Sequence, residues 1–372
     1  MTPLLLFLLC ITPASGFGAP RAPLISGQES TSRLFVFGLG YVGARLAREM
    51  DESPGWAVAG TVISLSLASS IPPSVRVFEF DACPAAPKLL DPQGLCFLRR
   101  ATHVLISIPP MDGYDPVVDL YRSELLKNCA CLRWLGYLSS TSVYGDRQGA
   151  WVTEDDEVRP VTSKALARVR AEQAWMELRQ CMPDRPLLCR VFRLAGIYGP
   201  DRNALTTLRK GMSGAQGGGS LPRLDGDSFV SRIHVEDIIR ILRCSMDETV
   251  ETGTEVEIYN VADNRPASRL EVFSFAARLL GDESILSNYH HAPSASTNAH
   301  HFPSTSPRAL SRRARRPESK RVSNKKMRKL LSESKAALAS LNLRHPTFIE
   351  GLCSILKDEK ADIEQKNLEN NS

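Results

Sequence analysis

The chain has 372 residues, 43% of them hydrophobic and 23% charged, so it is long enough to bury one large core or two smaller ones. Its formal net charge of +5 comes from one stretch, because Arg308 to Lys329 holds eleven Lys or Arg and one acidic residue, while the rest of the chain is net acidic. A single basic stretch beside an acidic body is typical of a tail or loop and argues against a body built to bind nucleic acid or a membrane surface.

The nine cysteines are odd in number and include no C-x-x-C pair. Several of them, such as Cys189 and Cys244, lie within apolar runs, where a free cysteine packs as a small hydrophobe. This usage predicts reduced thiols rather than a secreted disulfide framework, and it predicts no metal site.

The first 33 residues have the features of a targeting presequence. Residues 4–11 form an apolar run too short to span a bilayer, and small residues follow at 14–16, as at a cleavage site. Residues 17–33 are rich in Ser, Pro and Gly, and Phe17 after small residues resembles the bipartite presequences of algae with secondary plastids. We therefore expect a plastid protein, with secretion as the alternative. No later segment is apolar over the length of a membrane span, so we expect no membrane insertion of the mature protein.

Residues 34–37 are predicted as a buried strand that leads directly into a G-x-G-x-x-G motif, formed by Gly38, Gly40 and Gly43, and a helix predicted over 41–50 follows. In this context the first glycine permits a tight turn, the second lets a pyrophosphate approach the backbone, and the third lets helix and strand pack closely. The N-terminus of the helix, at Tyr41 and Val42, offers unpaired N–H groups to an anion. The motif therefore predicts an N-terminal Rossmann-type dinucleotide-binding domain.

The identity of the dinucleotide stays open. An acidic residue about 20 positions after the motif would hold the ribose 2′-OH of NAD and an Arg would favour NADP, but no charged residue lies between Gly55 and Val75. Asp81, after the predicted strand 75–80, is either a partner of the adenine amino group or a turn cap. We expect NAD or NADP, held by Gly38, Gly40, Tyr41, Val42, Gly43, Thr61, Asp81 and Ser107.

Short apolar runs alternate with amphipathic stretches along most of the chain. The predicted strands are 34–37, 57–63, 75–80, 102–108, 135–139 and 187–194, and the predicted helices among them are 41–50, 116–132 and 163–180. Continuous apolar strands separated by helices indicate a doubly wound parallel sheet covered on both faces, the α/β class. Later helices at 204–210, 234–246 and 267–280, with a strand at 257–261, predict a small C-terminal lobe that binds the substrate. The expected domains are 34–195 for the cofactor and 196–281 with 318–356 for the substrate.

Residues 282–317 break this alternation, because they are rich in Ser, Pro and Ala and then in Arg. They contain two His pairs, at 290–291 and 300–301, but no positioned partners for a metal ion, so we expect a disordered basic insertion. The insertion has no interleaved aromatic residues for base stacking, and nucleic acid is therefore not an expected partner. A helix near 325–334 and a terminal helix near 349–357 follow, and 357–372 is predicted as a frayed tail.

The segment YLSSTSVYGD from Tyr137 resembles the extended short-chain dehydrogenase/reductases, the NAD-dependent epimerase/dehydratase superfamily. Further likenesses follow in the same order: RLAGIYGP from Arg193, RIHVED from Arg232, YNVAD from Tyr259 and ESKRVSN from Glu318. They cover 34–281 and 318–356, and they are most similar to a mainly bacterial, atypical subgroup of poorly defined chemistry.

The resemblance implies that Ser140, with Thr141 beside it, orients a substrate carbonyl or hydroxyl. It also implies a Tyr-x-x-x-Lys acid–base pair about 20 residues later, but the two positions hold Lys164 and Arg168, and neither residue type reproduces the pair. Three interpretations stay open. In the first, Tyr144 acts as the acid–base group near Lys164 or Arg168. In the second, Arg168 holds a ribose or phosphate without redox chemistry. In the third, Lys164 and Arg168 are solvated helix residues.

The resemblance further implies that Arg202, Asn203 and Arg232 line the substrate cleft, where arginine suits an anionic ligand. His234 is interpreted as structural, with Asp237 capping the helix that follows. We expect an NAD(P)-dependent oxidoreductase or epimerase-like enzyme acting on a small hydroxyl- or carbonyl-bearing or sugar-nucleotide-like substrate. The alternative is a non-redox nucleotide-binding sensor or an RNA-associated plastid protein. Members of the family often pair through the helices that correspond to 116–132 and 163–180, so a homodimer is compatible with the sequence.

Overall fold

The computed structural model describes residues 32–370 apart from residues 84, 112, 213–223, 225, 249–255, 287–317 and 334–341. The predicted presequence lies outside the described residues except for its last two. The predicted basic insertion likewise lies outside them except for its first five residues. These five belong to the C-terminal lobe instead, because Ile285 and Leu286 in the short helix η3 (Glu283–Leu286) are buried there.

Seven parallel strands form the central sheet, in the order β10-β7-β5-β4-β1-β2-β3. Their bounds are β1 (Ser32–Phe37), β2 (Trp56–Val62), β3 (Arg76–Glu79), β4 (His103–Ile106), β5 (Trp134–Ser140), β7 (Leu188–Leu194) and β10 (Glu257–Val261). Each corresponds to a strand predicted from an apolar run, and the predicted α/β class is confirmed. The strand order reverses between β1 and β4, which is the point where open α/β sheets bind ligands, beyond the carboxyl ends of the strands.

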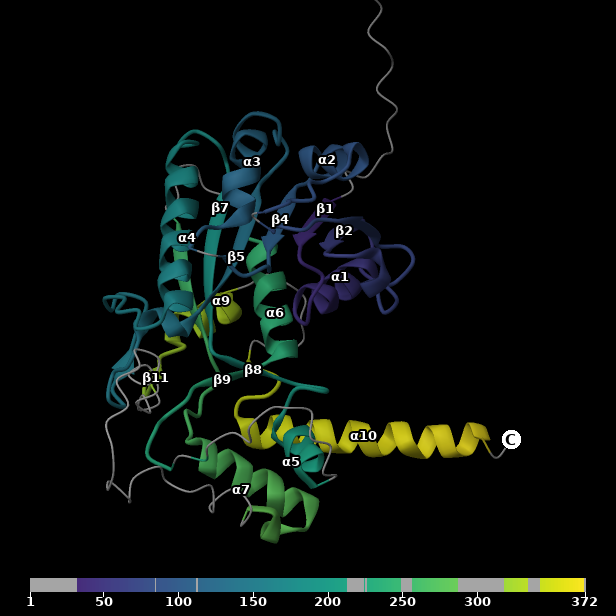
Figure 1. The fold of residues 1–372 in the computed structure, drawn as a ribbon, viewed down its shortest axis with the longest axis vertical. Coiled ribbons are helices and arrows are strands. Elements are labelled where there is room, and N and C mark those ends of the chain that lie inside the picture. Colours follow the sequence, from purple (N-terminus) through teal and green to yellow (C-terminus); the bar gives the residue numbers. More distant parts are fainter. Residues whose placement is uncertain are drawn as a thin grey trace, which may run out of the picture.

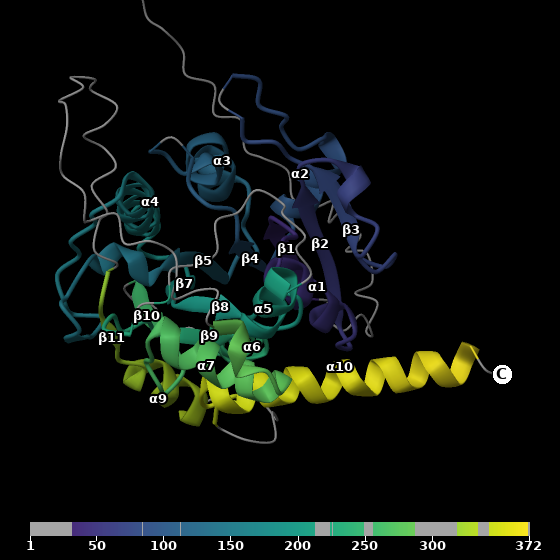
Figure 2. The ribbon, with the colours of Figure 1, turned by 60° about the horizontal axis from the view of Figure 1, so that its bottom comes forward.

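Helices cover both faces of the sheet, as Figure 2 shows. Alternate side chains of β1 enter two different cores, Leu34 and Val36 on one face and Phe35 and Phe37 on the other. The first face is covered by α1 (Gly43–Asp51), α6 (Val235–Met246) and α9 (Lys325–Glu333), and the second by α2 (Pro92–Arg99), α3 (Pro116–Lys127) and α4 (Ser163–Gln180). This burial on both faces explains why the strands are apolar throughout.

Helices α2 and α3 begin in the same way, with an aspartate cap followed by proline in the first turn. Asp91 accepts a hydrogen bond from Gly94 N, and Asp115 accepts from Val117 N and Val118 N. The sequence patterning predicted α3 but missed α2, because α2 is short and its first turn contains Gly94 as well as Pro92. The cap was the signal that could have located it.

The C-terminal lobe lies below the carboxyl edge of the sheet in Figure 1. It contains α5 (Ala204–Met212), α7 (Arg269–Leu280) and α10 (Phe348–Asn370) around their own core. Two pairs of short strands join it to the sheet domain, namely β8 (Gly196–Tyr198) with β9 (Arg232–His234), and β6 (Trp151–Val152) with β11 (Arg321–Val322). These strands are two or three residues long, too short for an apolar pattern to reveal.

Helix α10 corrects the predicted frayed tail, since the helix continues to Asn370. Both views show its C-terminal half projecting beyond the lobe (Figures 1 and 2). Nearly every side chain after Lys360 is exposed, so this half carries no apolar stripe that could have predicted it. No helix among the described residues is long and apolar enough to cross a bilayer. All eight described cysteines are free, and Cys129, Cys189 and Cys244 are buried as small hydrophobes, while four others are exposed.

A buried histidine makes the fold sensitive to acid. His103 at the start of β4 lies between the rings of Trp56 and Trp134, with its Nδ1 2.8 Å from Thr102 Oγ1. Burial, reinforced by the nearby Arg133, lowers the pKa of His103 to about 3. As the pH falls, His103 is therefore protonated in the unfolded chain before it is protonated in the folded protein. Folding stability falls as the pH drops from about 6.5 toward 3, by about 1.4 kcal/mol per pH unit.

We expect His103→Gln to reduce this loss. Between pH 7 and pH 5 the free energy of unfolding of the wild type should fall by about 2 kcal/mol more than that of the variant, as measured by urea denaturation. Other groups, such as His234, titrate in both proteins, so the difference between them isolates His103. Parallel pH profiles would show that His103 is not a source of acid sensitivity.

Candidate functional site

A cavity of about 1110 Å³ opens at the carboxyl ends of β1, β4 and β5, between the sheet and the C-terminal lobe. Its walls come from three parts of the chain: the glycine turn with the ends of β2 and β4, the segment after β5 with the start of α4, and residues of the lobe. Its polar lining side chains include Thr61, Ser107, Ser140, Thr141, Arg168, Arg202, Arg269, Glu318 and Lys320.

The three glycines of the turn have different surroundings. Gly38 has a left-handed backbone with φ of 96°, and a Cβ there would meet Ile108 Cγ2 at 2.5 Å. A Cβ on Gly43 would meet the Gly38 carbonyl oxygen at 2.2 Å, so Gly43 allows α1 to pack against the turn. A Cβ on Gly40 would meet nothing within 4 Å, and Gly40 lines the cavity. The space in front of Gly40 is therefore open, as a pyrophosphate requires.

The start of α1 leaves backbone donors free beside this space. Val42 is the N-cap residue and no side chain caps the helix. Among the described residues no group accepts a hydrogen bond from the N–H of Tyr41 or Val42, and both residues line the cavity. Thr61 stabilises the turn, because its Oγ1 accepts a hydrogen bond from Gly38 N at 2.9 Å. Free amides at the positive end of a helix fit the diphosphate of a dinucleotide.

The end of the cavity next to β2 is apolar. Ile63 and Leu67 line it although both are more than half exposed, and Ser107 lines it from the end of β4. Asp81 does not line the cavity. Its carboxylate accepts from Cys83 N at 3.0 Å, and its backbone pairs with Lys88, which supports the turn-cap interpretation.

The five predicted catalytic residues divide into two groups. Ser140, Thr141 and Arg168 line the cavity together, and Arg168 Nη1 donates to Leu138 O at 2.9 Å. Lys164 is exposed in the first turn of α4 and lies outside the lining. Tyr144 is fully buried outside the cavity.

The hydroxyl of Tyr144 belongs to a buried network beneath Ser139 and Ser140. It donates to Asn260 Oδ1 at 2.7 Å and accepts from Arg193 Nη1 at 2.9 Å. Arg193 also pairs with Glu172 at 2.7 Å, and Ser139 Oγ donates to the same carboxylate at 2.5 Å. This location favours a structural role for Tyr144, since its phenol has both a donor and an acceptor and no face toward the cavity.

The lobe contributes cations that the predicted site set did not include. Lys320 is buried and lines the cavity, with its Nζ donating to Gly145 O at 2.9 Å and lying 2.8 Å from Glu318 Oε2. Arg269, at the start of α7, also lines the cavity and is exposed. The ESKRVSN likeness includes Lys320 but assigned it no role, and the pairing of β11 with β6 brings that segment to the end of β5.

The predicted substrate residues differ in position. Arg202 lines the cavity, but Asn203 and Arg232 do not. Asn203 Nδ2 donates to Gly199 O and its Oδ1 accepts from Thr206 N, which starts α5. Arg232 Nη1 donates to the backbone oxygens of Val230 and Ala267 and so ties β9 to the start of α7. Both side chains are engaged in holding the lobe together.

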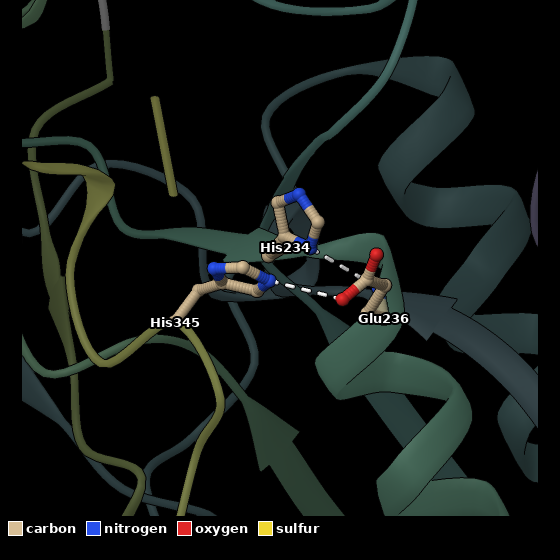
Figure 3. A group of neighbouring side chains, drawn as sticks. All are labelled: His234, Glu236 and His345. Carbon is tan, nitrogen blue, oxygen red and sulfur yellow. Dashed lines mark hydrogen bonds and ion pairs between the residues drawn. The ribbon is translucent and has the colours of Figure 1, made fainter. Parts of the chain in front are cut away.

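A second cluster, His234, Glu236 and His345, is the one group among the described residues whose ligand atoms lie close enough to share a metal ion, within 4.8 Å. Figure 3 shows how they lie. His234 Nδ1 accepts from Glu236 N at 3.3 Å, while its Nε2 points away from the other two side chains and has no partner among the described residues. His345 Nε2 and Arg344 Nη1 lie 3.0 and 3.2 Å from the same oxygen of Glu236. A cation would have to compete with Arg344, so these contacts favour a structural cluster.

This cluster fastens the segment before α10 to the start of α6. The predicted cap of α6 is corrected, because His234 and not Asp237 is the N-cap. Asp237 instead accepts from Arg344 N and His345 N, at 2.6 and 3.0 Å. Burial, and then the neighbouring His345, lower the pKa of His234 to about 3, so its ring is neutral at pH 7 and suited to accept a hydrogen bond.

Comparison with known proteins places the chain among α/β proteins of one architecture. No protein-family model matches it. Protein YeeZ of Escherichia coli (strain K12) is 28% identical over 261 residues, which cover 68% of this chain and 85% of YeeZ. A conserved protein of unknown function from Silicibacter pomeroyi DSS has a solved structure that is 31% identical, covers 88% of this chain and 99% of its own, and superposes with a TM-score of 0.62.

Solved structures of lower identity share the fold. UDP-glucuronic acid 4-epimerase from Bacillus cereus, determined in complex with NAD, is 18% identical, covers 88% of this chain and 99% of its own, and has a TM-score of 0.59.

Proposed function

We propose that the chain is an atypical short-chain dehydrogenase/reductase of the NAD-dependent epimerase/dehydratase superfamily, and that it is an NAD(P)-dependent oxidoreductase or epimerase-like enzyme acting on a small anionic compound with a hydroxyl or carbonyl group. One observation carries the proposal. The open glycine turn, the hydroxyls of Ser140 and Thr141, and the basic residues of the lobe line the same cavity.

The cofactor is NAD or NADP, and the residues present fit it. The free amides of Tyr41 and Val42 and the open space before Gly40 suit a pyrophosphate, and Arg168 lies where it can contact a ribose. When bound, a nicotinamide ring supplies or accepts a hydride. The solved structure of the Bacillus cereus UDP-glucuronic acid 4-epimerase, which shares the fold, was determined in complex with NAD and supports this assignment.

The side chains of the cavity can handle the oxygen of the substrate. When a carbonyl carbon receives a hydride, the π electrons move to oxygen, which then needs a proton. The hydroxyls of Ser140 and Thr141 can orient that oxygen, and the ammonium group of Lys320, which lines the same cavity from the lobe, can donate the proton. Lys320 would thereby perform the part of the missing Tyr-x-x-x-Lys pair, with a proton from solvent restoring it.

The charges of the cavity favour an anionic substrate. Beyond the glycine turn Arg168, Arg269 and Lys320 line it, and Glu318 is the one carboxylate among its described lining residues. Glu318 is already paired with Lys320, so a carboxylate or phosphate on the substrate would meet positive charge. Because of this excess of positive charge, we expect a neutral analogue of the same shape to bind more weakly than the anionic substrate.

The test begins with binding. Titration with NAD, NADH, NADP and NADPH should give saturable binding of at least one pair, and a ligand at 100 times its Kd should stabilise the fold by about 2.7 kcal/mol. A panel of carboxylate- or phosphate-bearing carbonyl compounds, with neutral analogues as controls, is then screened for oxidation of the reduced cofactor. Lys320→Met should lower turnover about 10²-fold or more, and Ser140→Ala should lower it too.

Tyr144→Phe is the matched control, because it changes a buried hydroxyl outside the cavity. It should leave turnover close to that of the wild type. The proposal fails if no dinucleotide binds. The catalytic assignment fails if Tyr144→Phe abolishes turnover while Lys320→Met and Ser140→Ala do not.

A second candidate function is favoured by one observation. The tyrosine position of the family pair holds the exposed Lys164, and Tyr144, the tyrosine considered as its replacement, is buried outside the cavity. A protein of this kind can retain the dinucleotide site and serve as a nucleotide-responsive sensor. Tight binding without turnover across the whole panel would favour the sensor over the enzyme.

A further inference from the structure

A turn of the C-terminal lobe rests on the glycine turn. Residues 199–202 follow β8, and Tyr41 Oη donates to Pro200 O at 2.8 Å. The contact is close, because a Cβ on Gly199 would meet Tyr41 Oη at 2.7 Å. This turn of the lobe therefore adjoins the glycine turn that is predicted to bind the pyrophosphate.

The turn is rigid and directs one side chain. Gly199 and Arg202 exchange two backbone hydrogen bonds, at 3.1 and 3.2 Å. Between them Asp201 has a φ of 63°, one of two left-handed non-glycine residues in the described part of the chain. Asn203 Nδ2 donates to Gly199 O and closes the turn from the other side. A strained backbone that neighbouring contacts hold in place is typical of functional sites.

Arg202 is the cation that this turn presents to the cavity. Its guanidinium carbon lies 5.5 Å from the centre of the Tyr41 ring, and the exposed side chain lines the cavity. It forms no ion pair or side-chain hydrogen bond with any described residue, so its five N–H donors are available. Arg45 also stacks on Tyr41, at 3.9 Å, but it donates to Tyr41 O and does not line the cavity.

We propose that Arg202 is a cofactor clamp that binds the pyrophosphate of the dinucleotide from the lobe side, opposite the amides at the start of α1. The inference rests on the proposed function and moves Arg202 from the substrate cleft, where the sequence placed it, to the cofactor. A guanidinium beside Tyr41 can donate two parallel hydrogen bonds to phosphate oxygens. The stacking on Tyr41 holds it at that position before the ligand arrives.

The experiment measures Kd with ligands that separate the pyrophosphate from the rest of the dinucleotide. Wild type, Arg202→Gln and Arg269→Gln are titrated with ADP-ribose, which has the pyrophosphate but no nicotinamide, and with adenosine, which has neither. Arg269→Gln is the matched control, because it removes an exposed cavity arginine that belongs to α7 and not to the turn at 199–202. Thermal unfolding verifies that each variant is folded, as expected for exposed side chains.

We expect Arg202→Gln to raise the Kd for ADP-ribose about 10- to 100-fold and to leave the Kd for adenosine unchanged. ADP-ribose binding should also become less sensitive to salt. Arg269→Gln should leave the Kd for ADP-ribose unchanged. The clamp is refuted if Arg202→Gln binds ADP-ribose like the wild type, or if both variants weaken it equally, which would indicate general electrostatic attraction. A wild-type protein that binds no dinucleotide at all would instead overturn the proposed function.

Discussion

Gly40→Ala should fold like the wild type and lose most of its affinity for the dinucleotide. A Cβ at this position meets no protein atom within 4 Å, so folding does not require glycine there. The methyl group would occupy the space in front of the free amides of Tyr41 and Val42, where the pyrophosphate must approach the backbone. Each lost hydrogen bond to a charged group costs about 1.5–3 kcal/mol, so we expect Kd for NAD or NADP to rise at least about tenfold.

Two comparisons make this result specific. Thermal unfolding of ligand-free Gly40→Ala should match that of the wild type, and adenosine should bind it equally well. Gly43→Ala should differ, because its Cβ would lie 2.2 Å from the Gly38 oxygen and push α1 away from the sheet, so that both stability and binding fall. If Gly40→Ala binds the dinucleotide with unchanged Kd, the ligand does not approach the turn at Gly40.

The central sheet could be predicted because each strand buries both faces and is therefore a continuous apolar run. The glycine turn could be predicted for a related reason, since its strand, turn and helix are contiguous in sequence. What could not be predicted is pairing over long distances. The pairing of β6 with β11 involves two residues on each strand and joins segments about 170 positions apart, and no local pattern encodes it.

The same limit explains the candidate site. Ser140, Thr141 and Arg168 were found because the resemblance to the extended short-chain dehydrogenase/reductases assigns roles to their positions, which lie at the end of a predicted strand and on a predicted helix. Lys320 was not, because its place in the cavity depends on β11 and on a bond to Gly145 O. The opposite error concerns Tyr144, whose sequence context suggests a reactive phenol. Its buried partner Asn260 is 116 residues away, so the burial could only be seen in three dimensions.

Arg193→Met should destabilise the protein more than any other substitution considered, because it leaves a buried carboxylate without its partner. The side chains of Arg193 and Glu172 are only 5% and 3% exposed, and three hydrogen bonds link them. Removing one member of such a pair costs about 3–5 kcal/mol, which we expect urea denaturation to show as a lower midpoint with an unchanged slope.

An exposed pair provides the contrast. Arg209 and Glu359 lie 2.7 Å apart with side chains 42% and 31% exposed, so Arg209→Met should cost less than about 1 kcal/mol. Replacing both Arg193 and Glu172 with apolar residues should recover part of the loss, because the desolvation cost of the charges disappears with them. If Arg193→Met were no more harmful than Arg209→Met, the buried Arg193–Glu172 pair would contribute no more to stability than the exposed pair.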